Sequence, residues 1–513
     1  MKTISSSPRL QAQPKVVLGC AYKLAASGLG LFLLAGCQVA PLAFSDAQLS
    51  NYAFDKLQRA TADQEPISGS VTLYEAMARA VKYNLDYKVE IMNRQLANKN
   101  LRLKRYDMLP QLVANGDWTK RNNNAHSYSQ TLFANVRSVD PSTSKGDAHF
   151  VGDATFSWHI LDFGLSYVRA QQAADEALIA EENKRKTINR IIEDVRTAYW
   201  RAVSADRLLA GFHRLRHRTE KAIAQSRRLY KARRTSPVSA LSYERELVDI
   251  KRQIHRLERE LKTAKIQLAA LMNVNPGTDY KLHIPPRRLT ALRINKSGDQ
   301  MVEMALQKRP ELREIQYRER SNAKEAKAAL LEVLPGAQIY AGMNLDTNDF
   351  LYNSNWVSYG AKVGWNLMKV FSYPARKGQV DARAELLDKR ALATTMAIMT
   401  QVYVARARYK YLYRSAQTAA EYYDVQSKLN KQVKASVRSG VASQQTLIRE
   451  EMNTLVAAVQ YDLAYADLQN AFATVYSAVG LDPYEKTIST TMSVKGIADI
   501  LRQSWRNRGD LHS

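Results

Sequence analysis

The sequence predicts a mainly α-helical chain with a few membrane-type β-strands, organised as two copies of one helix, β-hairpin and helix unit. Three observations predict this fold class. Residues that punctuate the chain recur at a fixed spacing, which indicates a duplication. Long proline-free stretches carry heptad spacing, which is typical of paired helices. Short segments alternate apolar and polar residues, as the strands of outer-membrane proteins do.

The duplication is visible in matched residues. Leu109-Pro110 recurs as Leu334-Pro335, whereas Trp158 recurs at a shorter spacing as Trp365. The shorter spacing then persists to the end of the second copy. The spacing changes only between the two matches, so the first copy carries an insertion in the polar stretch 122–146. Each copy is far longer than a solenoid repeat, which indicates duplication of a half-domain.

In each copy one helix precedes the strands and a helical hairpin follows them. Residues 73–108 lack proline and are predicted to form the first helix, with a break near Asn84. Residues 165–233 are predicted to form a helix on the order of 100 Å long at 1.5 Å per residue. Pro237 interrupts it, and a second helix returns over 238–272. This second helix has a heptad seam: Leu247, Ile250, Ile254, Leu257, Leu261, Ala264, Leu268 and Leu271.

The seam of the second copy is built from smaller residues, which suit close helix approach: Ala457, Tyr461, Ala464, Leu468, Ala471, Val475 and Ala478. Its hairpin is broken at Ser439-Gly440. For the helices alone, a soluble coiled coil is the simpler interpretation.

The strands are clearest in the second copy. Residues 337–345 and 357–367 alternate apolar and polar side chains, and residues 150–160 of the first copy do so more weakly. Such alternation over about ten residues is typical of outer-membrane strands, although a soluble, half-buried hairpin is the alternative. Four such strands cannot close a barrel, and an open edge in hydrocarbon leaves backbone groups unpaired. If the strands lie in a membrane, the chain must therefore oligomerise through them.

The N-terminus indicates export. Residues 1–36 combine basic residues with an apolar stretch and are predicted to be a cleaved signal peptide. Leu34-Ala35-Gly36-Cys37 resembles the bacterial lipobox, in which the cysteine is acylated and becomes the new N-terminus; an ordinary signal peptide with a chance cysteine is the alternative. Gln38 in place of aspartate implies sorting to the outer membrane. Cys20 would leave with the signal, so no intrachain disulfide is expected.

The formal net charge of +26 favours nucleic acid, an anionic membrane surface or an anionic cargo as the partner. Export from the cytoplasm makes nucleic acid a poor candidate. The sequence contains no CxxC, GxSxG, Walker or HExxH pattern, and two of its histidines lie among arginines in 213–217, a poor metal site. We therefore predict no enzyme, no cofactor and no metal site.

Together these features resemble the TolC-like outer-membrane efflux and secretion proteins. The resemblance rests on the lipobox, the two copies, the two Leu-Pro junctions, the passage 157–164 into the long helix, and Gly440-Val441-Ala442-Ser443 followed by Thr446-Leu447-Ile448. It covers residues 70–485. The resemblance implies a homotrimer with a shared twelve-stranded barrel in the outer membrane, continued by a periplasmic tunnel of twelve helices. It also implies a periplasmic adaptor (membrane-fusion) protein and an inner-membrane pump as partners in tripartite efflux or type I secretion.

On this basis the predicted organisation is as follows: 1–36 signal peptide, 37–70 lipid-anchored N-terminal segment, 71–276 first repeat, 277–300 equatorial linker, 301–483 second repeat, and 484–513 C-terminal equatorial segment or tail.

The resemblance also implies an entrance gate at the hairpin tips, where the family often carries aspartates in the second copy. The matching positions are Thr446 and Arg449, beside Gln445, with Val238 and Ser239 in the first copy. None of them is a carboxylate. We therefore expect a neutral or basic entrance that favours anionic cargo. The alternative is that the basic residues coat the outer helical surface or pair with acidic ones.

The same tips are where the family meets its adaptor. The candidate contact residues share a position at or beside the turns: Arg233, Arg234 and Pro237 in the first copy, and Ser439, Gly440 and Val441 in the second. Gly440 suits the left-handed conformation at a helix end, and the first copy has Arg233 roughly where the family has glycine. Each of these residues could instead serve the turn alone. The rival function is a structural periplasmic coiled-coil lipoprotein, tethered by Cys37 and without a pore.

Overall fold

The computed structural model describes residues 43–62, 64–133, 135–232, 236–289, 294–481 and 488–506. The chain divides into two compact units, Met1–Arg59 and Ala60–Ser513. In the first unit, helix α1 (Asp46–Ala60) begins after Ser45, whose hydroxyl accepts a hydrogen bond from the backbone N–H of Gln48 at 3.3 Å. No side chain of α1 is buried.

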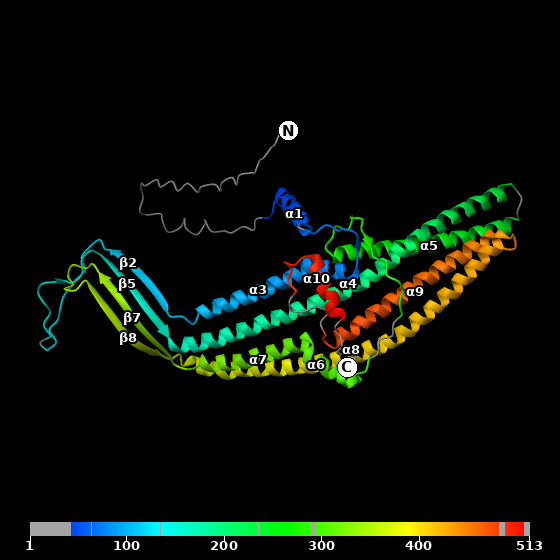
Figure 1. Ribbon diagram of the computed structural model, residues 1–513. Helices are drawn as coiled ribbons and strands as arrows, with labels where there is room; N and C mark the ends of the chain where they lie inside the picture. Colours follow the sequence, from blue (N-terminus) through cyan, green and yellow to red (C-terminus); the bar gives the residue numbers. More distant parts are fainter. Residues whose placement is uncertain are drawn as a thin grey trace. The chain divides into compact units, whose positions relative to one another are not determined.

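The second unit contains two copies of the same series of elements (Figure 1). The first copy consists of α3 (Leu85–Tyr106), β2 (Gln111–Lys120), β5 (Ala148–His159), α4 (Ile160–Lys231) and α5 (Pro237–Leu271). The second consists of α7 (Pro310–Leu331), β7 (Gly336–Asp346), β8 (Asn355–Gly364), α8 (Met368–Arg438) and α9 (Gln444–Ala478). Each end of α7 follows the same end of α3 by the number of residues that separates the two Leu-Pro pairs. Each end of α9 follows the same end of α5 by the number of residues that separates Trp158 from Trp365. The spacings seen in the sequence are therefore those of the folded elements.

The break predicted near Asn84 separates α2 (Leu73–Tyr83) from α3. The Asn84 N–H donates to the carbonyl of Ala80 at 2.9 Å and so ends α2, while its side-chain oxygen accepts from the N–H of Tyr87 at 3.1 Å and so begins α3. One residue thus caps two helices, which lets the chain turn without leaving backbone groups unpaired.

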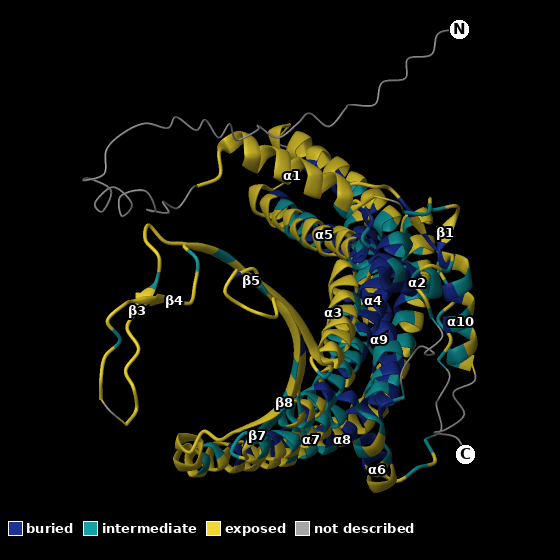
Figure 2. Ribbon diagram, turned by 90° about the vertical axis from the view of Figure 1, so that its left-hand side faces the viewer, coloured by how far each residue is buried: buried dark blue, intermediate teal, exposed yellow. Residues whose placement is uncertain are grey.

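The four long strands form one antiparallel sheet in the order β2-β5-β7-β8. The two copies meet in its middle, where β5 pairs with β7 from Val151↔Asp346 onward. Strands β7 and β8 confirm the two segments predicted from alternation, although Trp365 and Leu367 lie beyond β8. Strand β2 is the fourth strand that the duplication predicts, but its residues were not located because its sequence does not alternate cleanly. The sheet is strongly curved and mostly exposed (Figure 2), and β2 and β8 are its edges.

The helices pack through the predicted seams. On α5, Leu247 and Ile254 are fully buried in a core shared with α4 and α9, and Leu268 joins a second core beside α2. A third core lies between α8, α9 and α6 (Gly298–Lys308). Short elements flank the middle of the long helices: β1 (Ser70–Val71) pairs with β6 (Lys281–Leu282), and α10 (Val494–Arg506) packs on α2. A small hairpin of β3 (His126–Ser127) and β4 (Ser142–Thr143) lies within the insertion.

None of the helices in the described part of the chain has the length and apolarity required to cross a bilayer.

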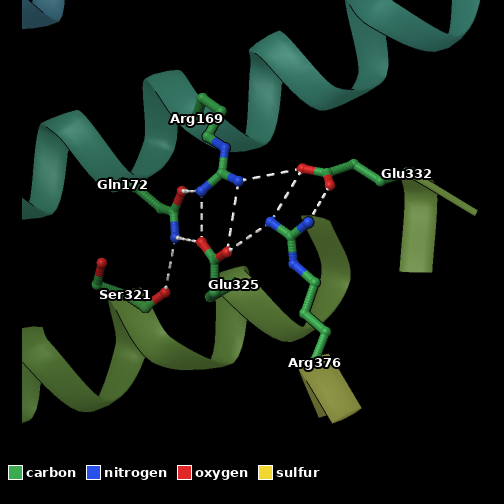
Figure 3. Close-up of polar contacts among 6 residues, drawn as sticks. All are labelled: Arg169, Gln172, Ser321, Glu325, Glu332 and Arg376. Carbon is green, nitrogen blue, oxygen red and sulfur yellow. Dashed lines mark hydrogen bonds and ion pairs between the residues drawn. The ribbon is translucent and has the colours of Figure 1, made fainter. Parts of the chain in front are cut away.

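A charged cluster joins three helices just below the sheet (Figure 3). Glu325 and Glu332 lie on α7 and at its end, and both contact Arg169 of α4 and Arg376 of α8. Each arginine places Nη2 3.2 Å from Oε1 of Glu332. Burial would raise the pKa of Glu325, but hydrogen bonds from Gln172 and Arg169 outweigh burial and hold the pKa below its ordinary value. The cluster fixes α7 between α4 and α8.

Candidate functional site at the hairpin tips

Each helical hairpin ends in a short turn at the end of the unit opposite the sheet (Figure 1). In the first copy, Ser236 is the N-cap of α5 and Pro237 its first residue, a position where proline's missing N–H costs nothing. In the second, Gly440 has φ +77°, and Ser443 caps α9 by accepting a hydrogen bond from the Thr446 N–H at 3.1 Å. A Cβ on Gly440 would meet no atom within 4 Å, so the backbone conformation alone favours glycine there.

The two tips are linked by one acidic side chain. Glu246, on α5, forms an ion pair with Arg449 of α9 and accepts a hydrogen bond from Gln445 Nε2 at 2.7 Å. The hydrogen bond from Arg449 holds the pKa of Glu246 below its ordinary value, although partial burial opposes it. The same bond raises the pKa of Arg449. Both groups are therefore charged at neutral pH, and the link is a charge-assisted hydrogen bond between the two hairpins.

A cavity of about 680 Å³ surrounds this link. It contains three of the five predicted gate residues, Ser239, Gln445 and Arg449, but neither Val238 nor Thr446. Its other lining residues come from the next turns of the same two helices: Ser242, Tyr243, Arg245, Glu246, Asp249, Ile250, Gln253, Met452 and Asn453. Val238 is instead 74% exposed at the turn, and Thr446 bonds to the Ser443 cap.

The carboxylates absent from the predicted gate positions are supplied two to three turns further along α5, by Glu246 and Asp249. Glu246 follows Ser239 by seven residues, which is two helical turns, so both lie on one face of α5. The seven-residue spacing from Ser239 is the signal in the sequence that would have identified Glu246, had the comparison continued past residue 241. Two acidic side chains (Glu246 and Asp249) and two basic ones (Arg245 and Arg449) line the cavity, so its formal charge is balanced.

The predicted adaptor contacts within the described residues are all exposed at the turns: Pro237, Ser439, Gly440 and Val441. Val441 is 83% exposed although it is apolar. Arg233, Arg234 and the predicted lipid-attachment residue Cys37 lie outside the described residues.

Further ties hold the hairpins together behind the cavity. Arg218 of α4 forms an ion pair with Glu451 of α9, and so also bridges the two hairpins. Gln426 of α8 donates to Glu450 of α9 at 2.6 Å, within the second hairpin. The two hairpins are therefore joined by these polar contacts and by the apolar core that α9 shares with α4 and α5.

Comparisons with known proteins address both sequence and fold. Residues 77–274 match the sequence profile of the outer membrane efflux protein family. The fold is similar to that of the Campylobacter jejuni CmeC outer membrane channel, with a TM-score of 0.64 and 13% identity over 87% of this chain and 95% of that one. No protein with a curated description matches the sequence significantly.

Two further channels give similar agreement. The open state of the Neisseria gonorrhoeae MtrE outer membrane channel has a TM-score of 0.60 and 15% identity over 80% of this chain and 89% of that one. The outer membrane protein VceC of Vibrio cholerae has a TM-score of 0.60 and 12% identity over 80% of this chain and 96% of that one. At these identities the likeness establishes the fold.

Proposed function

We propose that this chain, which has the TolC-like outer-membrane channel fold that its sequence predicts, is one subunit of a homotrimeric channel in the bacterial outer membrane. The channel is a passive exit duct. An inner-membrane pump supplies the energy, and a periplasmic adaptor joins the two in a tripartite efflux or type I secretion system. Acylated Cys37 anchors each subunit to the outer-membrane lipid. The observation that carries this proposal is that the two copies occupy non-equivalent surroundings within one chain.

Helix α7 is packed on both flanks, by α4 on one side and α8 on the other. Its counterpart α3 packs along α4, and its remaining flank presents large apolar side chains that are more than half exposed: Val89, Met92, Leu96, Leu103 and Tyr106. If the copies are equivalent, α3 also needs an α8 on that flank. We infer that a second subunit provides it.

The open flank differs chemically from its counterpart inside the chain. Within the chain, Lys186 of α4 pairs with Glu314 of α7. The residues at the corresponding positions are Ala393 of α8 and Val89 of α3, so an apolar contact replaces the ion pair. On α8 the apolar side chains left exposed near that level are Leu386, Leu392 and Met396. Burying two such stripes against each other favours association.

The sheet supports the same assembly. Its edges are β2 in the first copy and β8 in the second, and β5–β7 pairing already shows how one copy joins the next. Pairing β8 of one subunit with β2 of its neighbour removes both open edges, which is required of any sheet placed in hydrocarbon. Three subunits with four strands each make the twelve-stranded barrel that the family resemblance implies.

At the other end, we propose that the cavity around Glu246 and Arg449 is part of the entrance gate. The link holds the two hairpins of one subunit together and keeps the tips from separating. The surface for the adaptor is assigned to the turns, at Arg233, Arg234 and Pro237 in the first copy and at Ser439, Gly440 and Val441 in the second. Because the charged lining is balanced, the basic excess of the chain favours anionic cargo only weakly at this point.

The experiment that tests the channel is assembly and conductance of the purified full-length protein. We expect a trimer that shifts in mobility on heating and conducts in planar bilayers. Leu96→Glu, which places a carboxylate on the α3 stripe, should abolish the trimer, whereas Lys99→Glu on the same helix should leave it intact. A monomeric protein without conductance would instead support the coiled-coil lipoprotein.

A further inference from the structure

The insertion of the first copy forms a hairpin whose described tip residues include two highly exposed apolar side chains, Leu132 and Phe133. It occupies residues 121–147, between β2 and β5, whereas the corresponding connection between β7 and β8 is only 347–354. The two arms are paired at three levels. The Arg121 N–H donates to the Asp147 carbonyl at 2.7 Å, β3 pairs with β4, and Gln130 bridges to Arg137.

Several contacts join the two arms near the end of this hairpin. The Arg137 guanidinium lies 4.1 Å from the ring centre of Tyr128, and the Thr131 N–H donates to the Val136 carbonyl at 3.0 Å. Asn135 adopts φ +52°, a left-handed conformation that asparagine tolerates in tight turns. Yet Leu132 and Phe133, at the tip, are 90% and 99% exposed. Two neighbouring large apolar side chains that are almost fully exposed to solvent indicate an interaction surface.

The base of the hairpin is held at a fixed angle by one residue of the other copy. Asn348, in the β7–β8 connection, is only 4% exposed. Its Nδ2 donates to the carbonyl of Ser144 at 3.0 Å, and its Oδ1 accepts from the N–H of Gly146 at 3.3 Å. This pair of bonds imitates a strand partner for the returning arm. The direction of the hairpin is therefore set by the fold and is not left to a free loop.

The hairpin extends over the concave side of the curved sheet. Figure 1 shows the hairpin beyond the ends of the strands, and Figure 2 shows β3 and β4 on the concave side of the curved sheet. In a closed barrel the concave side is the lumen, whereas lipid lies on the convex side. In such a barrel the hairpin would therefore lie on the side of the lumen, which the other subunits share, and not on the side of the lipid.

We propose that Leu132 and Phe133 of the three subunits meet over the outer mouth of the channel and form an apolar plug that restricts its exit. The occupant of each tip is thus the same hairpin of the neighbouring copies. This inference rests on the trimeric channel proposed above. It adds a second constriction, at the opposite end from the hairpin tips and built from an insertion that the second copy lacks.

Oxidative cross-linking of the full-length protein in outer-membrane vesicles tests this contact. Phe133→Cys places a thiol at the tip, and we expect disulfide-linked dimers within the trimer. Tyr352→Cys is the matched control, because Tyr352 is equally exposed, at 101%, but lies in the shorter β7–β8 connection at the rim. It should stay largely uncross-linked, as should the unsubstituted chain, whose cysteines are Cys20 and Cys37.

A second variant tests the anchor. Asn348→Asp keeps the acceptor but removes the amide donor to Ser144, so in the Phe133→Cys background it should lower the dimer yield several-fold. Asn353→Asp, in the same connection, should not. If Phe133→Cys trimers form and conduct but give no more dimer than Tyr352→Cys, the plug is disproved while the channel stands. If no oligomer forms at all, both proposals fail.

Discussion

Arg169 and Arg376 occupy the same position in the two copies, and both bind the same two carboxylates, Glu325 and Glu332. The duplicated arginine is thus used twice around one helix, α7. The corresponding positions on α3 are Asn100 and Asp107, and Asp107 is paired locally with Lys104 at 3.0 Å. The two copies therefore share the arginine but differ in the acidic residues on the helix before the strands. As a result, the junction around α7 is ionic and forms within one chain.

Removing either arginine should weaken this junction. Arg169→Ala or Arg376→Ala leaves two partly buried carboxylates with one cation, and we expect each to cost about 1–2 kcal/mol. Because both share the same acids, the double variant should deviate from the sum of the single effects. The measurement is thermal unfolding of the purified protein. Lys377→Ala, which breaks an ion pair whose side chains are 57% and 59% exposed, is the control and should change little. Strict additivity would contradict the shared cluster.

The stability of this junction should depend on pH. The pKa of Glu325 is lowered from 4.5 in the folded chain, as are those of Glu311 and Glu314 on the same helix. A carboxyl group with a lowered folded pKa stabilises the fold above its unfolded pKa and loses that contribution as pH falls through the folded value. We therefore expect the unfolding temperature to decrease once the pH drops below about 4.5. Glu325→Gln should flatten this part of the profile, and an unchanged profile would exclude the group.

At the tips, breaking the link between hairpins should open the entrance. Glu246→Gln leaves Arg449 without its carboxylate, so the tips separate more readily and the single-channel conductance should rise several-fold. Exchanging the charges, Glu246→Arg with Arg449→Glu, should return the conductance toward that of the unsubstituted channel. Lys251→Ala is the matched control on the same helix, because its partner is Glu220 and neither residue lines the cavity. A Glu246→Gln channel that conducts as before would remove Glu246 from the gate.

The ion selectivity of the channel should follow the same pair. In the intact channel the balanced cavity predicts at most a weak preference for anions, which reversal potentials in a salt gradient will measure. Glu246→Gln leaves the positive charge of Arg449 uncompensated in a confined space, so the preference for anions should increase. Arg449→Gln should shift it toward cations. A clear cation preference in the unsubstituted channel would rule out a neutral or basic entrance.

Much of the fold follows from the sequence because it depends on neighbours along the chain. Heptad spacing placed the seam of α5, and Pro237 and Gly440 marked the two turns, since helix breaks are decided within a few residues. The duplication then paired the elements of one copy with those of the other. The residues of strand β2 could not be located in this way, because Leu112, Val113 and Ala114 are consecutive apolar residues and interrupt the alternation of apolar and polar side chains.

Which of the predicted gate residues line the cavity could not be predicted from the sequence. Matching to the family placed Val238 and Thr446 beside Ser239, Gln445 and Arg449, but the rotation of α5 and α9 about their axes brings only the last three to the cavity. The rotation of each helix about its axis depends on how the apolar seams of neighbouring helices interlock, and a single sequence does not specify this packing. Glu246 enters because it lies on the same face as Ser239.

The sequence by itself therefore determined the two copies, their long helices, three of the four long strands, and the places where the chain turns. Only the tertiary structure decided which charges meet. Arg169 and Glu325 are 156 residues apart, and Glu246 and Arg449 are 203 apart. No local periodicity connects such residues. Their contact depends on how α4 crosses α7 and how α5 approaches α9, and those crossings arise from the packing of whole helical surfaces.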